Sequence, residues 1–401
     1  MMTLNFMRFI DFWVGIPLCF FLTVFNKLTG LFRSKKDTAP NPRKILFLKP
    51  SEMGGIVLSY PLIRRMQAAY PQAQFFFVTF ECNRQIFDVL DIIPLKKIYT
   101  IRDTTFSQFV HDVFAVIAGM RKEKVDVVLD LEFFSRFTAI LSYLSSAPKR
   151  IGFDRFSFEG LYRGDLVTHK VIYNPQKHIS EMFLAFSQVV ASVAKVTPDL
   201  IERQCMDDQD RPQYQVQQPA IDAMREKLIR MGVPAASRMM LMNLGDGVLA
   251  LREWPFESFV TLGKKIVAQK DCFVLLIGTE NCKTKARQFC QALGKDVCLD
   301  LTGQTQIFEL FALFDIADAL IANDCGLAHL ASMTSIKQYV LFGPESPGIF
   351  APLGEHIHIF YSQWPCSPCL SVFNHRVSTC KNNICIQQIR PDDVFQAIQS
   401  R

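Results

Sequence analysis

An aspartate, a glycine and a histidine follow one another within six residues, just after an apolar run in the C-terminal half of the chain. Residues 317–322 are apolar except for Asp318, which predicts a buried parallel strand, and residues 323–326 break this pattern. Apolar residues then recur at helical spacing, so this stretch predicts a strand, a tight turn and a helix. Such a turn presents backbone N–H groups at a helix start, where the helix dipole favours an anion such as a phosphate.

We therefore expect this turn to bind a phosphate. Its residues are Asp324, Cys325 and Gly326. Asp324 would cap the helix, and His329 would lie about one turn further along, facing the same crevice. The alternative is an ordinary capped helix with a structural histidine.

Glycines follow two other predicted strands. Gly54 and Gly55 stand just before a helical pattern and permit close approach of the backbone to a phosphate or a sugar. Gly245 and Gly247 could serve a phosphate in the same way, or form a plain turn. The pattern G-x-G-x-x-G is absent, which argues against a dinucleotide cofactor.

A compact cysteine cluster with the spacing C-x2-C-x10-C-x4-C lies near the C-terminus. Its members are Cys366, Cys369, Cys380 and Cys385. Four thiolates at such spacing can enclose Zn²⁺ or, as a less favoured option, hold an iron–sulfur cluster. The site would have no open ligand position, so the metal would be structural and would stabilise a loop presenting His375 and Arg376. Disulfides and four free thiols are the alternatives.

Two series of alternating strands and helices would position these residues. The first series predicts strands at 45–48, 74–80, 98–100, 125–131 and 150–153, the last at a sheet edge, and helices at 57–70, 87–93, 106–121, 138–145 and 178–193. The second predicts strands at 239–244, 273–277, 297–299, 319–321 and 338–342, the last of its core, and helices at 220–231, 256–269, 284–293, 307–314 and 392–399. This alternation predicts an α/β fold with two doubly wound parallel sheets.

The domain boundaries follow from composition. The polar, Gln-rich stretch 198–219 separates an N-terminal domain, 43–205, from a C-terminal domain, 215–390, and residues 391–401 form a terminal helix. In open sheets of this kind, ligands bind at the carboxyl ends of the strands.

The first 42 residues predict a membrane-attachment helix and a linker. Large apolar residues fill positions 6–25, but the uncharged run 12–25 has only 14 residues, and a full span needs about 20. Basic residues follow this run, which favours a cytoplasmic location for the next domain. A short spanning helix and a kinked helix lying in the membrane interface are both open. A helix packed on the protein's own core is the third alternative.

Composition narrows the classes of partner. A net charge of +6 without a long Lys/Arg block gives no sign of nucleic-acid binding. The 12 cysteines, several in apolar or helical settings, suit a reducing compartment. The N-terminal apolar segment lacks a signal-peptide cleavage site, so we expect it to be retained.

Four motifs follow one another along the chain. They are the strand and glycine loop 44–57, Arg252-Glu253-Trp254-Pro255, Asp324-Cys325-Gly326-Leu327-Ala328-His329-Leu330-Ala331, and Leu341-Phe342-Gly343-Pro344. In this order they resemble the motifs of glycosyltransferase family 9, the heptosyltransferase-like enzymes of lipopolysaccharide core biosynthesis. The resemblance extends from about Arg43 to the C-terminus and implies a GT-B arrangement, in which two Rossmann-like domains face a cleft.

The resemblance also implies roles for single residues. Arg252 matches the family's basic residue before x-Trp-Pro and, with His329, would stabilise the leaving diphosphate; the alternative is a surface cation. Glu280 resembles the glutamate that contacts the ribose, and the alternative is a solvated charge at a helix start.

The chain departs from the family at the general base, because Gly55 stands where the family pattern has Asp. Glu52 on the same loop is the nearest replacement, unless it is only an exposed loop charge. Asp103 and Asp130 are further options on the same sheet. The departure indicates a different acceptor, a relocated base or a loss of activity.

We thus expect a membrane-associated, inverting glycosyltransferase that requires no cofactor for catalysis. Its partners would be a nucleoside-diphosphate sugar, with ADP-heptose suggested by the family, a lipid-linked glycan acceptor and the membrane surface. Its location would be the cytoplasmic face of the inner membrane. The alternatives are a nucleotide-sugar epimerase or hydrolase, and an inactive glycan-binding assembly protein.

Overall fold

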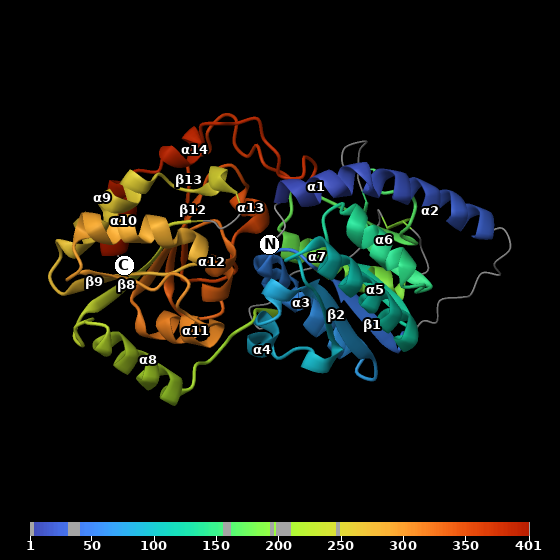
Figure 1. Cartoon of the computed structure of the whole chain (residues 1–401), viewed down its shortest axis with the longest axis horizontal. Coiled ribbons are helices and arrows are strands. Elements are labelled where there is room, and N and C mark those ends of the chain that lie inside the picture. The colour runs from blue at the N-terminus through green and yellow to red at the C-terminus, as the bar shows by residue number, and fades with distance from the viewer. Residues whose placement is uncertain are drawn as a thin grey trace. The chain divides into compact units, whose positions relative to one another are not determined.

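The computed structural model describes residues 4–30, 41–154, 162–192, 196–197, 210–245 and 249–400. The chain divides into two compact units, and Figure 1 shows each as a sheet with helices on both faces. The first unit is Met1–Asp210 together with Val372–Asn374, and the second is Arg211–Ser371 together with His375–Arg401.

The first unit contains a parallel sheet of seven strands in the order β3-β2-β1-β4-β5-β6-β7. The strands are β1 Lys44–Leu48, β2 Gln74–Phe80, β3 Ile98–Ile101, β4 Val127–Asp130, β5 Lys149–Asp154, β6 His169–Ile172 and β7 Val196–Thr197. The order reverses between β1 and β4, so loops leaving these two strands diverge and open a crevice at their carboxyl ends.

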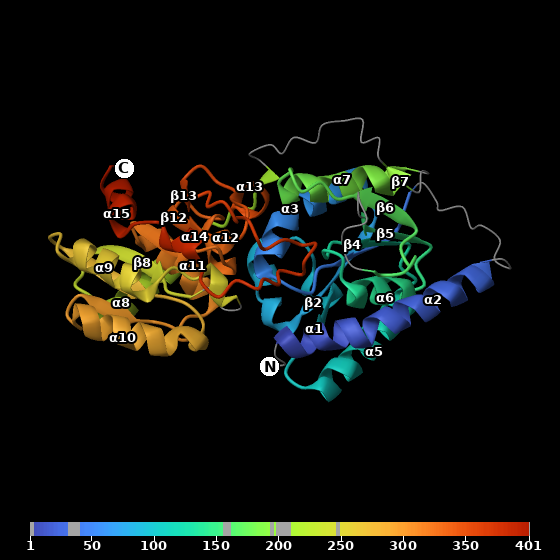
Figure 2. The same cartoon turned by 90° about the horizontal axis from the view of Figure 1, so that it is seen from above.

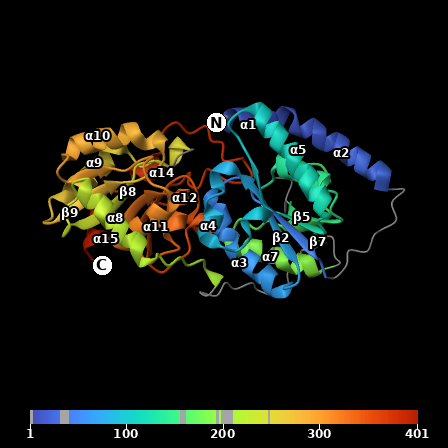
Figure 3. The ribbon, with the colours of Figure 1, turned by 60° about the horizontal axis from the view of Figure 1, so that its bottom comes forward.

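Helices cover both faces of this sheet. They are α1 Leu4–Trp13, α2 Gly15–Gly30, α3 Met53–Ala69, α4 Ile86–Leu90, α5 Phe106–Glu123, α6 Arg136–Leu144 and α7 Ile179–Ala191, with short 3-10 turns η1 Glu81–Asn83 and η2 Leu95–Lys97. Leu46 and Leu48 pack in one core cluster with residues of α5 and α6. Figure 3 shows α5 on one side of the sheet and α3 and α7 on the other. Phe47 points to the opposite face, where it stacks on Phe77. This alternation is the two-residue period of a strand buried on both sides.

The second unit contains a parallel sheet of six strands in the order β10-β9-β8-β11-β12-β13. The strands are β8 Arg238–Asn243, β9 Cys272–Leu276, β10 Cys298–Asp300, β11 Ala319–Asn323, β12 Lys337–Phe342 and β13 Ile357–Tyr361. The helices are α8 Gln218–Arg230, α9 Phe256–Val267, α10 Lys283–Leu293, α11 Ile307–Ile316, α12 Gly326–Ala331, α13 Pro347–Phe350, α14 Ile384–Gln387 and α15 Pro391–Gln399, with η4 Ala250–Arg252 and η5 Glu280–Cys282. Trp254 and Phe259 anchor the core on one face of this sheet.

The predicted fold class is confirmed, and three details differ. Residues 150–153, predicted at an edge, lie in β5 between β4 and β6. Strands β6, β7 and β13 were not predicted, because β6 and β13 are only partly buried along their length and β7 has two residues. Helix α3 begins at Met53 rather than at residue 57, so Gly54 and Gly55 belong to its first turn.

Candidate functional site

The carboxyl end of β11 holds the two polar residues around which the second unit's site is built. Asn323 is buried, and its Oδ1 accepts a hydrogen bond from the backbone N–H of Trp254 at 3.0 Å. This bond fixes the turn that carries Arg252. Arg252 Nη1 lies 3.6 Å from Asp324 Oδ2 and donates to the Asp324 carbonyl at 3.4 Å. Burial raises the pKa of Asp324, and the charge of Arg252 opposes this rise.

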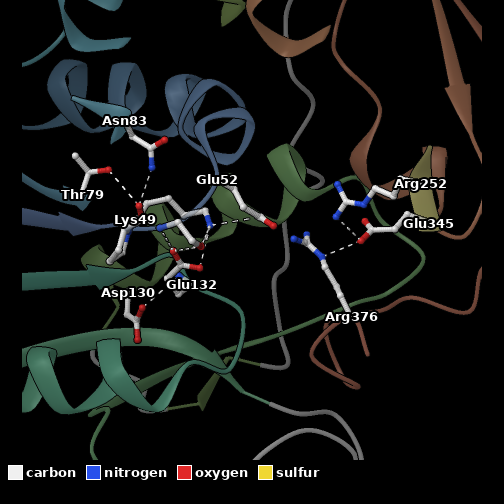
Figure 4. A network of polar contacts seen from close by, with 11 residues as sticks. Lys49, Glu52, Thr79, Asn83, Asp130, Glu132, Arg252, Glu345 and Arg376 are labelled. Atoms are coloured by element: carbon white, nitrogen blue, oxygen red, sulfur yellow. Dashed lines mark hydrogen bonds and ion pairs between the residues drawn. The ribbon is translucent and has the colours of Figure 1, made fainter. Parts of the chain in front are cut away.

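A buried carboxylate after β12 joins two guanidinium groups. Glu345 is 1% exposed, and its Oε1 lies 2.8 Å from Arg252 Nη2 and 2.9 Å from Arg376 Nε (Figure 4). The Arg376 guanidinium also lies over the Phe350 ring, 5.1 Å from its centroid. A guanidinium has five N–H donors in a plane, so the shared carboxylate orients both groups and leaves them capacity to bind phosphate oxygens.

The turn after β11 differs from the prediction in its capping. Cys325, not Asp324, is the N-cap residue of α12, and no side chain makes a capping bond there. Asp324 does not cap because its carboxylate is directed toward Arg252. His329 lies in α12 as predicted and is 6% exposed.

Glu280 lies in the turn that follows β9 and meets the turn that follows β10. Its carboxylate is 65% exposed, and Oε1 lies 2.8 Å from Lys283 Nζ. Gly303 has a φ of +69°, and a Cβ there would collide with Glu280 Oε2. Glycine at 303 therefore lets an exposed carboxylate rest against this turn, where it can accept hydrogen bonds from sugar hydroxyls.

The predicted residue Gly245 lies at the same edge of the sheet, buried just after β8. Asn243, which was not predicted, donates from Nδ2 to the Ile277 carbonyl at 3.0 Å and ties β8 to the end of β9. Gly247 lies outside the described residues. The residues after β8, β9, β10, β11 and β12 come from adjacent parallel strands, so their polar groups gather at one edge of the sheet.

A second polar cluster lies at the switch point of the first unit, between β1 and β4. Lys49 is fully buried, and its Nζ lies 2.9 Å from Glu132 Oε2 and 3.9 Å from Glu52 Oε2 (Figure 4). Glu132 Oε1 accepts from both the backbone N–H and the hydroxyl of Ser51, at 2.7 and 2.6 Å. The loop that carries Glu52 is thus held from both sides.

Glu52 itself has an unusual backbone. It is the N-cap residue of α3, with φ 61° and ψ 99°, and its side chain is 36% exposed. A non-glycine residue in this region costs about 1–3 kcal/mol, and such residues cluster at functional sites. A Cβ at Gly55 would lie 2.5 Å from Lys49 Cε and 3.2 Å from Nζ, so the space beside Gly55 is filled by the lysine.

The other two predicted carboxylates are buried. Asp130 is fully buried at the end of β4, its Oδ1 accepts the N–H of Glu132 at 3.2 Å, and burial raises its pKa to about 7. Asp103 is 7% exposed. Asp130 orients the turn that carries Glu132 and is too enclosed to reach an acceptor, which leaves Glu52 as the more accessible carboxylate.

Cys366, Cys369, Cys380 and Cys385 lie in one region, but their sulfur atoms are not arranged as the ligands of a metal ion. The pKa of the Cys385 thiol is raised by burial and by the charges of Cys369, Cys366 and Cys380. Cys380 Sγ donates to the Asn382 carbonyl at 3.1 Å. Among the residues that the structure describes, no group of three or more His, Cys, Asp or Glu is placed to hold a metal ion. The cysteines as placed do not fit a metal, and the metal site stays a prediction.

Three residues of these clusters were missed from the sequence as site residues: Lys49, Glu132 and Glu345. Each follows a strand by one to three residues, at the ends of β1, β4 and β12. That position at the carboxyl end of a parallel strand is the signal that could have found them.

Comparisons with known proteins agree with this arrangement. Residues 113–376 match the sequence model of glycosyltransferase family 9 (heptosyltransferase). Lipopolysaccharide heptosyltransferase 2 of Salmonella typhimurium is 23% identical over 336 residues, which cover 79% of this chain and 87% of that protein.

Solved structures show the same fold. The structure of Escherichia coli ADP-heptose lipopolysaccharide heptosyltransferase II gives a TM-score of 0.68 at 19% identity, covering 89% of this chain and 98% of that one. Escherichia coli heptosyltransferase WaaC with ADP-2-deoxy-2-fluoro heptose gives 0.62 at 15% identity, covering 89% and 99%. At these identities the likeness establishes the fold, which is the expected GT-B class of two Rossmann-like units.

Proposed function

Because the chain belongs to glycosyltransferase family 9, we propose that it transfers a heptose from ADP-heptose to a lipopolysaccharide core acceptor. The transfer inverts the anomeric centre, uses no catalytic metal and takes place at the cytoplasmic face of the inner membrane. The relatives support the donor and the acceptor, since those proteins are named lipopolysaccharide heptosyltransferases and one was solved with an ADP-heptose analogue.

The observation that carries this proposal is the pair of guanidiniums on Glu345 at the strand ends of the second unit. When the bond between the sugar and the diphosphate breaks, negative charge develops on the leaving phosphate. Arg252 and Arg376 are oriented to receive that charge, with His329 and the backbone of Cys325 and Gly326 as further donors. Glu280 would hold the ribose hydroxyls, and Gly245 would border the phosphates.

The acceptor hydroxyl needs a base as it attacks the anomeric carbon. We assign this role to Glu52, which takes the proton of the hydroxyl as the new glycosidic bond forms. Its support is the strained backbone at the start of α3 and the cluster of Lys49 and Glu132 that holds its loop. Gly54 and Gly55 lie in the first helical turn beside it, and the missing side chain of Gly55 makes room for Lys49 rather than for a substrate.

The test is a transfer assay with purified chain, ADP-heptose and lipopolysaccharide from a heptose-deficient strain, read by mass spectrometry. We expect an acceptor heavier by one heptose, with release of ADP. Glu52→Gln should lower kcat by about 10²- to 10⁴-fold. Arg252→Gln should lower kcat/KM by roughly 10- to 100-fold, because a charge-assisted bond contributes about 1.5–3 kcal/mol.

The matched control is Glu355→Gln, an exposed carboxylate outside both clusters, which should leave the rate unchanged. A wild-type kcat for Glu52→Gln would refute the base assignment. Release of free or epimerised sugar without acceptor would indicate a hydrolase or an epimerase. Tight donor binding with no turnover of any acceptor would indicate an inactive glycan-binding protein.

A further inference from the structure

The N-terminal helices form one long rod on the first unit. Backbone bonds from Val14 N–H to the Ile10 carbonyl at 2.9 Å, and from Leu18 N–H to the Val14 carbonyl at 3.1 Å, carry α1 into α2 across Val14. Figures 1 and 2 show this rod running along α6. The segment Phe6–Thr29 is long and apolar enough to cross a membrane by length and composition. The contacts of this segment with the first unit determine in which orientation it can bind a membrane.

One face of the rod is bound to the first unit by a buried ion pair. Asp11 Oδ2 lies 2.6 Å from Arg136 Nη1, and the Arg136 side chain is only 3% exposed. Arg136 Nε also donates to the Tyr162 carbonyl at 2.7 Å. Gly15, one turn after Asp11, lets the helix approach the arginine, because a Cβ there would lie 3.0 Å from Arg136 Cδ. Breaking this contact would leave a buried charge without its partner, which is strongly unfavourable.

The same face makes a second contact further along. Cys19 is fully buried with Ala139 and Leu166 in a small apolar cluster. Thr23 Oγ1 accepts the backbone N–H of Asp165 at 2.9 Å. Gly164, with φ +67°, brings this loop against the helix, since a Cβ there would collide with Thr23 Oγ1 and the Cys19 carbonyl. The rod is therefore held over Asp11 to Thr23, a length of about 18 Å at 1.5 Å per residue.

The remaining surface of the rod is almost wholly apolar and exposed. The exposed large side chains are Phe6, Phe9, Phe12, Trp13, Val14, Leu18, Phe20, Phe21, Val24, Phe25 and Leu28. We call this set the aromatic face. Burying each such side chain contributes about 1.5–3 kcal/mol, so leaving all of them in water is unfavourable.

The chemistry of the aromatic face favours lipid over a protein partner. A protein interface usually carries a polar rim with about one hydrogen bond per 100–200 Å². Trp13 is the one member of the aromatic face with a polar side-chain atom, and its indole suits the membrane–water boundary. Lys27 is exposed at the end of α2, where it can meet anionic headgroups, and the sequence continues with further basic residues, Arg33, Lys35 and Lys36.

We propose that the rod is a docked, in-plane anchor. One face stays bound to the first unit while the aromatic face enters one leaflet of an anionic phospholipid bilayer, with the helix axis parallel to the membrane. Such helices insert about 5–10 Å, to the boundary between headgroups and acyl chains. A spanning orientation would require the helix to leave Arg136 and to carry Asp11 into the hydrocarbon, which is costly. The inference rests on the membrane location proposed above.

Vesicle flotation of the purified full chain tests the surface. We expect wild type to float with vesicles of phosphatidylcholine mixed with phosphatidylglycerol, and less with phosphatidylcholine alone. The double change Phe21→Glu with Phe25→Glu should weaken binding about tenfold or more. Phe308→Glu is the matched control, because Phe308 is a comparably exposed phenylalanine of α11 in the second unit, and it should bind as wild type. If the wild-type protein does not float with the anionic vesicles, the proposal is wrong.

Quenching by brominated lipids tests the orientation. The Trp13→Phe variant, which keeps Trp254 and Trp364, supplies the background signal to subtract. After subtraction, Trp13 in the wild type and Phe20→Trp in the Trp13→Phe background should be quenched equally, and best by bromines near the headgroups. A tryptophan at 20 quenched best by bromines at the acyl-chain ends would indicate a spanning helix and overturn the in-plane anchor. A dimer that forms without lipid in wild type but not in the double variant would assign the face to a second copy and also overturn it.

Transfer to a water-soluble, deacylated acceptor separates this inference from the proposed function. Wild type and the double variant should transfer to that acceptor at equal rates. Transfer without vesicle binding would refute only the in-plane anchor. Vesicle binding without transfer to any acceptor would refute only the proposed function.

Discussion

At the scale of single residues, Glu345 has the most connected position in the second unit. It is almost fully buried, yet it contacts two arginines that come from separate loops. A buried carboxylate between two cations is stable because each charge is compensated. We expect it to position Arg252 and Arg376 before the diphosphate arrives, so that no reorientation is needed when charge develops.

Glu345→Gln tests this positioning role. The amide keeps the shape but loses the charge, so the two guanidiniums repel each other without compensation and lose orientation. We expect kcat/KM for ADP-heptose to fall by roughly 10- to 100-fold, as for loss of a charged hydrogen bond. Because the donors themselves remain, added ADP should still raise the melting temperature, but at higher concentration than for wild type. Unchanged ADP affinity and rate would exclude the role.

Asp130 provides a pH-dependent prediction. Burial raises its pKa from 3.8 to about 7, so between these values the folded state keeps a proton that the unfolded state releases. Its contribution to stability is complete below about pH 4 and is lost as the pH rises through 7. Asp130→Asn cannot ionise, so its free energy of unfolding should rise relative to wild type from pH 4 to pH 8 in urea titrations. Parallel pH profiles for the two proteins would contradict this, and exposed Asp165→Asn is the control.

The sequence predicted which residues lie at the site better than it predicted their hydrogen-bond and ion-pair partners. Arg252, Asp324 and Glu280 all lie at the predicted sheet edge, because a motif and a strand pattern mark each of them. The capping role of Asp324 was wrong, since spacing cannot reveal that Arg252 competes for its carboxylate. Glu345 and Lys49 were missed because their partners lie 93 and 83 residues away in sequence.

At the scale of elements, a buried ion pair is one of the contacts that dock α1 and α2 on α6. Asp11→Asn leaves the Arg136 charge buried and unpaired, which should cost about 3 kcal/mol. We expect a lower midpoint in urea unfolding and faster proteolysis within residues 4–30. The double change Asp11→Leu with Arg136→Met removes both charges and should recover most of the loss. A single variant as stable as wild type would show that the pair does not hold the rod.

The segment that carries the cysteine cluster, residues 366–385, is the element whose sequence pattern and structure agree least. The spacing alone predicts four metal ligands, but a metal also needs three or four sulfur atoms to converge. In the described chain Cys366 is exposed and Cys385 is buried, so the thiols differ in environment. Elemental analysis of the purified protein for zinc and iron decides between a metal and free thiols.

At the scale of the whole molecule, the order of strands and helices could be predicted because both sheets are parallel and buried. Their strands read as apolar runs, and the intervening helices show their own period. Strands β6, β7 and β13 were not predicted, since partly buried or two-residue strands carry a weak pattern. Whether the N-terminal helix packs on protein or lipid was left open. The structure shows one face packed on protein, and the other is exposed.

Removal of residues 1–30 should therefore do more than release the protein from vesicles. It would uncover Arg136, Ala139 and Leu166, which the rod now covers. We expect the melting temperature to fall by roughly 5 °C or more, as a loss of a few kcal/mol implies for a unit of this size. Phe21→Glu with Phe25→Glu should keep the wild-type melting temperature while losing vesicle binding. An unchanged melting temperature for the truncated chain would contradict the docking contacts.

The distance in sequence between Asp11 and Arg136 has a consequence for biosynthesis. These partners are 125 residues apart, so the aromatic face leaves the ribosome well before the arginine exists. At about 5–20 residues per second, the nascent helix waits roughly 6–25 seconds for its docking surface. During that interval the apolar side chains of the nascent helix have no folded surface to pack on. We therefore expect a bilayer or a chaperone to bind the helix while translation is still under way.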